Sequence, residues 1–550
     1  MFPKLIPHSR RSFIRGSAAL LASSRIARAD TAACAPYIGP VATGCALADS
    51  YTSVYGTPQI ETVNGALGVC VPQISTVQAT SSLSRTPCVM MEDPSIAKTI
   101  QIVLPTWYVD YPSGPNRCGS GNEINQPGVT SFRVAIEWTP GAALVPVTFQ
   151  GSPTPSPAAG GVNFISDPIT NSGGLNQRFW VWIVQYNPTG IIYRDRSRGL
   201  GDGRNTEAWL YNINQNILNY GLTNQSYDNF FATGPNAYGT DLNGNHNQYT
   251  FRPLAILGLT SKPTVALMGS SRVVGLGDDY LDGSGFIGSM ERSIGPNFAY
   301  LQLGRSSELV TAFISSGARR LQLSGLCSHV LEDFGGDDLL GGVPFDGQNQ
   351  PGLLAFKKLF WAQLGKPPER IFSMTIDPVT GSSDFWTSAA NQTANAYQAE
   401  FVQFNAFIRG LNNGVNPVDT AKVQEPSWTG NENFTWGNLS YTINSFSYSG
   451  NEVVANLTST AGLNIGDYVA VTAAGGGHGV YAIDAINSAQ IELYQSTYGN
   501  TWSGNGALIA SLCASNPNFG PGIADGIHES PTGYQNIKNS GVIASSLFHF

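Results

Sequence analysis

The pattern of hydrophobic and polar positions changes twice along the chain, and the first part alternates with period two. Between 131 and 138 every second residue is large and apolar, which places one face of an extended strand on a core. Residues 100–104 and 179–186 form similar runs, and Pro/Gly-rich segments such as 152–157 separate them. We therefore predict a β-sandwich or jelly roll over residues 30–255.

Between 265 and 410 short apolar runs alternate with helical periodicity. Residues 265–268 form a four-residue apolar run typical of a buried parallel strand. The spacing of Tyr397, Phe401, Phe404 and Ile408 predicts a helix that ends at Gly410, and residues 351–364 form another amphipathic stretch. This region predicts a parallel sheet covered by helices, with ligands bound outside the carboxyl ends of the strands.

Strand patterns return between 425 and 513, for example at 452–457, 467–472 and 490–494. We interpret this segment as a β-rich insertion that divides the α/β domain into a first part, 256–424, and a second part, 514–550. Two roles stay open for the insertion. Either its loops overhang the active site and help to select substrates, or the insertion is a remote decoration.

The first 29 residues have the pattern of an export signal. Arg10 and Arg11 lie in a twin-arginine motif at 9–15, the mildly apolar segment 16–24 follows, and 27–29 is a small-residue cleavage site. The alternative is a disordered basic tail. Because no run of about 18 apolar residues occurs, we predict no membrane anchor and a periplasmic or secreted protein.

Charge and cysteine content fit an exported protein. Six of the 29 basic residues lie in the predicted signal, which leaves 23 basic against 37 acidic residues and a net charge of −14. Such an acidic surface opposes binding to nucleic acid. Seven cysteines cannot all pair with one another, and a disulfide between Cys327 and Cys513 is geometrically plausible.

Acidic clusters raise the question of a metal site. Asp278, Asp279 and Asp282 form one cluster and the loop 241–247 forms another, and oxygen ligands suit calcium. The loop lacks the glycine and the closing glutamate of an EF-hand, so a solvated turn is the favoured interpretation. No Cys/His spacing typical of zinc occurs either. We predict neither a metal nor a cofactor.

Three short segments carry candidate chemistry: 269–271, 335–338 and 525–528. Ser271 follows the apolar run 265–268, where a strand would turn into a loop open to substrate. Asp525 and His528 are three residues apart, so the carboxylate can orient an imidazole that faces the serine hydroxyl. Each segment alone is weak evidence. The pattern Gly-x-Ser-x-Gly of α/β-hydrolases is absent, because Val273 occupies the position of the second glycine.

Over residues 265–424 and 514–550 these segments resemble the four sequence blocks of the SGNH (GDSL-type) hydrolases. Ser271 falls in the position of the nucleophile, Gly304 ends the second block, Asp337 stands where the family has asparagine, and Asp525 with His528 forms the Asp-x-x-His block. The resemblance implies a flavodoxin-like three-layer α/β/α domain. It also implies a Ser271–His528–Asp525 triad, with an oxyanion hole formed by Ser271, Gly304 and Asp337.

The sequence departs from that family in two places. Ser270 replaces the aspartate beside the nucleophile, and Asp337 replaces an amide donor with a group that is normally ionised. The resemblance implies a carboxylic-ester hydrolase. Export and the accessory β regions suggest an O-acetylated carbohydrate as the substrate. A carbohydrate-binding protein on an inactivated scaffold and a lipase or arylesterase are the alternatives, and acyl length and oligomeric state stay open.

Overall fold

The structure is a computed structural model of the chain. It describes residues 37–43, 195–196, 208–213 and 249–250 and, apart from short gaps, residues 81–187 and 253–549. The predicted signal 1–29, the loop 241–247 and Asp525 lie outside the described residues, as do Cys34, Cys45, Cys70 and Cys118.

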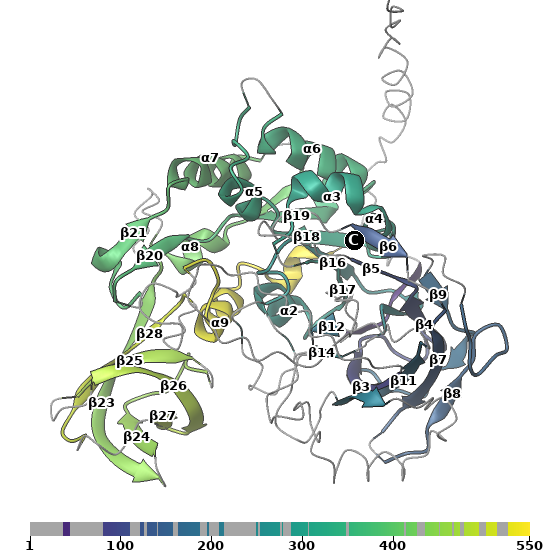
Figure 1. Cartoon of the computed structure of the whole chain (residues 1–550), viewed down its shortest axis with the longest axis horizontal. Coiled ribbons are helices and arrows are strands. Elements are labelled where there is room, and N and C mark those ends of the chain that lie inside the picture. The colour runs from purple at the N-terminus through teal and green to yellow at the C-terminus, as the bar shows by residue number, and fades with distance from the viewer. Residues whose placement is uncertain are drawn as a thin grey trace, which may run out of the picture. The chain divides into compact units, whose positions relative to one another are not determined.

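Two antiparallel sheets form the first part of the described chain (Figure 1). The first sheet contains β1 (Tyr37–Pro40), β15 (Ala255–Thr260), β4 (Thr99–Pro105) and β10 (Ile169–Thr170), with β9 (Asn163–Ile165) beside β4. The second contains β13 (Ala208–Ile213), β3 (Ser81–Met90), β11 (Arg178–Tyr186), β7 (Ser131–Glu137) and β8 (Val145–Val147), with β2 (Ala42–Thr43) beside β3. Apolar side chains of β4 and β7 belong to one shared core, so the two sheets pack face to face. The strands predicted at 100–104, 131–138 and 179–186 are confirmed.

The next region contains a five-stranded parallel sheet in the order β17-β16-β18-β19-β22. Its strands are β16 (Thr264–Met268), β17 (Ala299–Gln302), β18 (His329–Glu332), β19 (Ile371–Met374) and β22 (Asn416–Val418). Counted along the chain this order is 2-1-3-4-5, the flavodoxin-like order. All five residues of β16 are buried, as the apolar run predicted.

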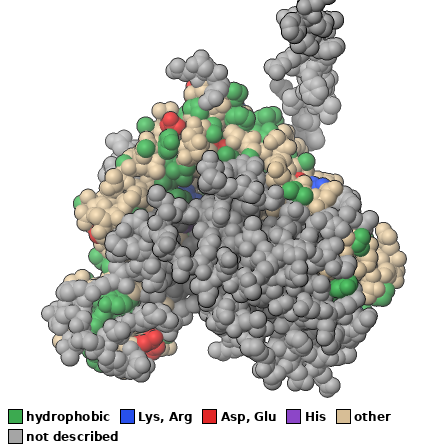
Figure 2. Space-filling view, in the orientation of Figure 1, with side chains coloured by type: hydrophobic (Ala, Val, Ile, Leu, Met, Phe, Trp, Pro, Cys, Tyr) green, Lys and Arg blue, Asp and Glu red, His purple; other side chains and the backbone are tan. Residues whose placement is uncertain are grey.

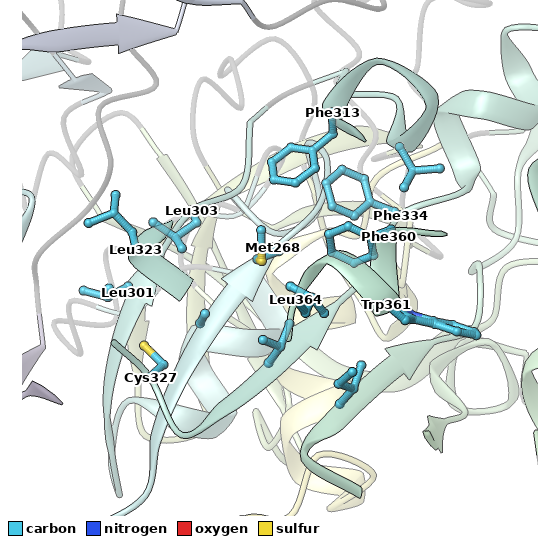
Figure 3. Close-up of a cluster of buried hydrophobic side chains, with 14 of the residues drawn as sticks. Met268, Leu301, Leu303, Phe313, Leu323, Cys327, Phe334, Phe360, Trp361 and Leu364 are labelled. Atoms are coloured by element: carbon cyan, nitrogen blue, oxygen red, sulfur yellow. The ribbon is translucent and has the colours of Figure 1, made fainter. Parts of the chain in front are cut away.

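Helices cover both faces of this sheet. They are α2 (Gly288–Ile294), α3 (Val310–Ser316), α4 (Ala318–Ser324), α5 (Gly336–Leu340), α6 (Leu353–Gln363), α7 (Gln398–Arg409), α8 (Thr420–Gln424) and α9 (Pro531–Ser540). Ala266 and Met268 of β16 pack in a core with α3, α6 and α7. Figure 3 shows Met268 in this core together with aromatic side chains of α3 and α6, Phe313 and Phe360 among them. Val265 and Leu267 pack in a second core with α2 and α9. Alternate residues of one strand therefore face two helical layers, and the parallel sheet and the helix ending at Gly410 are confirmed.

A closed six-stranded antiparallel barrel lies between α8 and α9 in the sequence. Its strands, in order around the barrel, are β23 (Asn438–Ser449), β24 (Glu452–Leu457), β27 (Gln490–Leu493), β26 (His478–Asn487), β25 (Tyr468–Ala473) and β28 (Gly506–Ser511). Its core is a separate apolar cluster that includes Ile443, Val469 and Leu508. After the barrel the chain returns to the α/β region, where α9 contacts α2 and α8.

The remaining described strands are β5 (Trp107–Val109), β6 (Glu123–Asn125), β12 (Asp195–Arg196), β14 (Tyr249–Thr250), β20 (Thr380–Ser382) and β21 (Gln392–Ala394), and the short 3-10 helices are η2 (Pro368–Arg370), η3 (Ala389–Asn391) and η5 (Ser545–Leu547). The surface of the described residues visible in Figure 2 is mainly apolar or uncharged, in keeping with a charged content of 12%. Among the described helices none is long and apolar enough to cross a membrane.

The Cys327–Cys513 disulfide that the sequence left plausible does not form, because Cys327 is a buried thiol. Cys327 precedes β18 and therefore lies at the amino ends of the parallel strands. Cys513 forms a β-bridge with Glu529, the neighbour of His528. His528 contacts Ser271, which follows the carboxyl end of β16. The two cysteines are thus at opposite edges of the sheet.

Candidate active site

Ser271 and His528 meet although 257 residues separate them in sequence: His528 Nε2 lies 2.6 Å from Ser271 Oγ. Both side chains are buried, with 4% and 2% of their surface exposed. Ser271 stands in the turn after β16, as expected. This turn needs Gly269, whose φ is +141° and whose Cβ, if present, would lie 1.7 Å from Asp333 Oδ1.

Asp333 places a carboxyl group against the serine turn. It follows β18, the strand next to β16, and its Oδ1 accepts a hydrogen bond of 2.9 Å from the Ser270 N–H. The order of the parallel strands reverses between β16 and β18, and that point is where such sheets bind ligands. Burial raises the pKa of Asp333 to about 7, the Ser270 N–H and Arg272 oppose the shift, and Glu332 and Asp337 add to it.

The Gly304 N–H, a predicted oxyanion donor, is engaged within the protein. It donates to Gln302 Oε1 at 2.9 Å. The Gln302 amide is itself oriented, because Nε2 donates to the Val273 carbonyl at 2.6 Å and to Glu291 Oε1 at 3.1 Å. Glu291 also accepts a hydrogen bond of 2.7 Å from Tyr300 Oη. Gly304 is therefore held at the site, but its N–H serves an oxyanion only if Gln302 moves.

Asp337, the other predicted oxyanion residue, lies in the first turn of α5 and is half-buried. Its neighbour Asp338 has a structural role, since its carboxyl group accepts hydrogen bonds from the N–H groups of Val310 at 2.9 Å and Thr311 at 3.1 Å, at the start of α3. Burial raises the pKa of Asp338 to about 6. The charge of Asp337 adds to the raised pKa values of both Asp333 and Asp338.

The loop before His528 is held from two sides. The Gly526 carbonyl accepts hydrogen bonds from the Thr380 N–H at 3.0 Å and from Trp436 Nε1 at 3.2 Å. A Cβ on Gly526, whose φ is +64°, would lie 1.9 Å from the Thr380 carbonyl oxygen. Asp525, the predicted orienting acid, is outside the described residues, so its contact with His528 stays a prediction.

Arg272 connects the serine turn to the histidine loop, and the sequence reasoning missed it. Its Nη2 donates to the Ile527 carbonyl at 2.8 Å and to the Asp377 carbonyl at 3.3 Å, and its Nε donates to Ile527 at 3.2 Å. The carboxyl groups of Asp377 and Glu529 lie 3.8 and 3.9 Å from the guanidinium. A signal existed in the sequence, because Arg272 is a lone cation in an apolar segment directly after Ser271.

Asp278, the described member of the acidic clusters, is occupied by an ion pair. Its oxygens accept hydrogen bonds from Arg292 at 2.7 and 2.8 Å and from the Gly288 N–H at 2.7 Å. Asp279, Asp282 and the loop 241–247 lie outside the described residues. Within the part of the chain that the structure describes, no three His, Cys, Asp or Glu side chains gather as a metal site would require.

No protein-family profile and no curated protein matches the sequence. Among solved structures, the chain is similar to a possible lipase from Chitinophaga pinensis, with 14% identity and a TM-score of 0.26, over 51% of this chain and 96% of that one. It is also similar to a carbohydrate acetylesterase from Xanthomonas citri, with 10% identity and a TM-score of 0.23, over 74% and 97% of the two chains. A family two carbohydrate esterase from Cellvibrio japonicus matches with 8% identity and a TM-score of 0.22, over 70% and 85%. Similarities at these TM-scores carry no argument about fold or activity.

Proposed function

We propose that the chain is a serine carboxylic-ester hydrolase in which Ser271 is the nucleophile. The observation that carries this proposal is the 2.6 Å contact between Ser271 Oγ and His528 Nε2 at the carboxyl end of β16. A serine hydroxyl is a weak nucleophile on its own and becomes reactive when an imidazole accepts its proton. A buried pair at the switch point of a parallel sheet has both the contact and the location that acyl transfer needs.

In the proposed reaction His528 Nε2 takes the proton of Ser271 as Oγ attacks the ester carbonyl. The tetrahedral intermediate collapses to an acyl-enzyme when the carbon–oxygen bond to the alcohol breaks, and His528 returns the proton to the leaving alcohol. Water, deprotonated by His528, then attacks the acyl-enzyme and releases the acid and free Ser271. Asp525, by its position in the sequence, is the residue that orients the imidazole.

The Ser271 N–H is the first oxyanion donor in this proposal. A second donor normally contributes, since losing one costs on the order of 10²–10³ in rate. The Gly304 N–H donates a hydrogen bond of 2.9 Å to Gln302 Oε1 in the structure. Gly304 can therefore fill this role only after that hydrogen bond is broken. The reaction needs no cofactor.

For the substrate we propose the ester of a short acyl group, with an O-acetylated carbohydrate as the alcohol part. The predicted export signal and the accessory β regions support an extracellular polymer as the target. A second candidate is a carbohydrate-binding protein on an inactivated scaffold. The engaged Gly304 N–H and the Asp333 carboxyl group against the serine turn favour that candidate, because a carboxylate beside the nucleophile opposes an oxyanion.

The test combines covalent labelling with a substrate screen. Wild type and Ser270→Ala should react with a fluorophosphonate, whereas Ser271→Ala should not, because the Ser271 hydroxyl is the one that contacts His528 Nε2 in this pair of serines. The protein should hydrolyse acetylated polysaccharides and p-nitrophenyl acetate faster than p-nitrophenyl esters of long acids. Turnover that rises with acyl length would indicate a lipase. If the wild type shows no turnover and is not labelled, the binding protein would be supported instead.

We also propose that the twin-arginine segment directs export into the periplasm or medium, with cleavage after Ala29. Replacing Arg10 and Arg11 by lysine should leave an uncleaved precursor in the cytoplasm, because the pathway reads the arginine pair. Immunoblots of cell fractions measure this. Normal export of the twin-lysine protein would show that the segment is not such a signal.

A further inference from the structure

Arg272 spans the two halves of the proposed site. It follows Ser271 directly in the sequence, and its side chain reaches the carbonyl of Ile527, the residue before His528. Two of its N–H groups, Nε–H at 3.2 Å and Nη2–H at 2.8 Å, converge on that one oxygen. The nucleophile and the base are therefore joined by a second connection besides their own hydrogen bond. It runs from the backbone beside Ser271 to the backbone beside His528.

The same guanidinium also contacts a third loop. Asp377 lies after β19, and its backbone carbonyl accepts a hydrogen bond of 3.3 Å from Nη2. Arg272 is only 9% exposed, so these contacts form away from water, where a hydrogen bond to a charged group is stronger than at the surface. The serine turn, the loop after β19 and the histidine loop thus meet at one cation.

Two buried carboxyl groups supply the counter-charge. Asp377 and Glu529 are each 1% exposed, and both lie within 4 Å of the guanidinium. One cation balances one carboxylate, and burial together with Asp377 raises the pKa of Glu529 well above its ordinary value. Arg272 opposes that shift and is the cation on which both buried carboxyl groups converge. Removing Arg272 would leave a buried charge uncompensated.

We propose that Arg272 is a positioning residue that holds the Ile527 carbonyl, and through it the His528 ring, at hydrogen-bonding distance from Ser271. This inference rests on the proposed function for its catalytic consequence, but the geometric part stands alone. Arginine suits the role because its planar fork presents several donors in fixed directions, whereas the lysine ammonium is a compact charge on a flexible stem.

The test compares Arg272→Gln and Arg272→Lys with wild type in crystal structures and in p-nitrophenyl acetate hydrolysis. In Arg272→Gln we expect the Ser271 Oγ–His528 Nε2 separation to exceed 3.5 Å, the usual hydrogen-bond limit. We expect kcat to fall about 10²-fold with KM changed less than about threefold, because a misplacement of about 1 Å costs that much in rate while substrate contacts remain. Arg272→Lys should lose less, about tenfold in kcat, since it keeps the charge.

Arg320→Gln is the matched control. Arg320, in α4, is also a buried arginine between two carboxylates, but its partners are Glu308, just before α3, and Glu123 of β6. The Arg320→Gln variant should have a lower thermal unfolding temperature, with the Ser271–His528 separation and KM unchanged. If Arg272→Gln does not fold, Arg272→Lys decides the question alone.

The outcomes separate this inference from the proposed function. An unchanged Ser271–His528 separation with wild-type kcat in folded Arg272→Gln or Arg272→Lys would overturn the positioning role. If wild type neither hydrolyses esters nor reacts with a fluorophosphonate, the proposed function fails. The crystallographic separation then still decides whether Arg272 holds the histidine loop.

Discussion

At the scale of single residues, the unusual feature of the site is an acidic residue against the serine turn. The Asp333 carboxyl group binds the Ser270 N–H, and Asp337 lies close enough to raise the pKa of Asp333. From the sequence, three states of Asp337 were open: protonated by burial, turned away from the oxyanion, or inactivating. The second is our prediction, because Gly336 before it allows the loop a different course and protonation requires a large pKa shift.

The Asp337→Asn variant should therefore change the rate of ester hydrolysis by less than about tenfold. It should also shift the titration of Asp333. A neighbouring negative charge disfavours ionisation, so its removal must lower the pKa of Asp333 from about 7. Any inflection of kcat/KM near pH 7 that arises from Asp333 should move to lower pH. Rates of p-nitrophenyl acetate hydrolysis between pH 5 and 9 measure both effects.

Asp346→Asn, the same change at an exposed position, is the control and should leave the profile unchanged. A gain of a hundredfold or more in Asp337→Asn would show that Asp337 suppresses catalysis in the wild type. That result would favour the binding protein over the esterase.

The sequence predicted some of these residues and missed others for a physical reason. Ser271 and His528 could be proposed because each lies in a short motif whose residue types suggest chemistry. Arg272, Asp333 and Gln302 carry no such motif. Their roles depend on which strands are neighbours, since Asp333 meets Ser270 only because β18 lies beside β16. Single-sequence periodicity gives the faces of a strand but not its partners.

At the scale of elements, the sequence again predicts which segments are strands but not which strands pair. The buried run of β16 predicted a parallel strand, and its alternate residues do enter two different cores. Strands were also predicted at 452–457 and 467–472, where β24 and β25 occur. The closure of the barrel was not predicted, because it depends on β23 pairing with both β24 and β28. The short α5 was missed as well, and five residues with two glycines nearby give no helical period.

At the scale of the whole molecule, the barrel has a direct connection to the segment that carries His528. Asp467 precedes β25 and accepts hydrogen bonds from the Asn464 N–H at 2.7 Å and from the Thr532 N–H at 2.8 Å, and it also bonds the Thr532 hydroxyl. Thr532 is in the first turn of α9, four residues after His528. One carboxyl group therefore fixes a barrel loop and the start of α9 together, which bears on the two roles left open for the insertion.

We predict that Asp467→Ala loosens the start of α9 and lowers kcat about tenfold, with KM little changed. The variant leaves the buried Thr532 N–H without its acceptor, at a cost of about 1–3 kcal/mol, and also removes the acceptor of the part-buried Asn464 N–H. Because about 1.4 kcal/mol is a factor of ten in an equilibrium, amide hydrogen exchange at Thr532 should accelerate about tenfold or more. Exchange measured by NMR or mass spectrometry, together with ester hydrolysis, tests both parts.

Asp167→Ala is the matched control, because Asp167 binds the same set of donors: the N–H groups of Gln150 and Gly151 and the hydroxyl of Thr148. The loop that contains Asp167 belongs to the sandwich sheets. Asp167→Ala should therefore accelerate amide hydrogen exchange at Gln150 and Gly151 and leave kcat unchanged. Faster exchange at Thr532 in Asp467→Ala with wild-type kcat would mean that the barrel stabilises α9 without influencing the site. The insertion would then be a remote decoration. A fall in kcat confined to Asp467→Ala would instead make the barrel part of what keeps His528 in place.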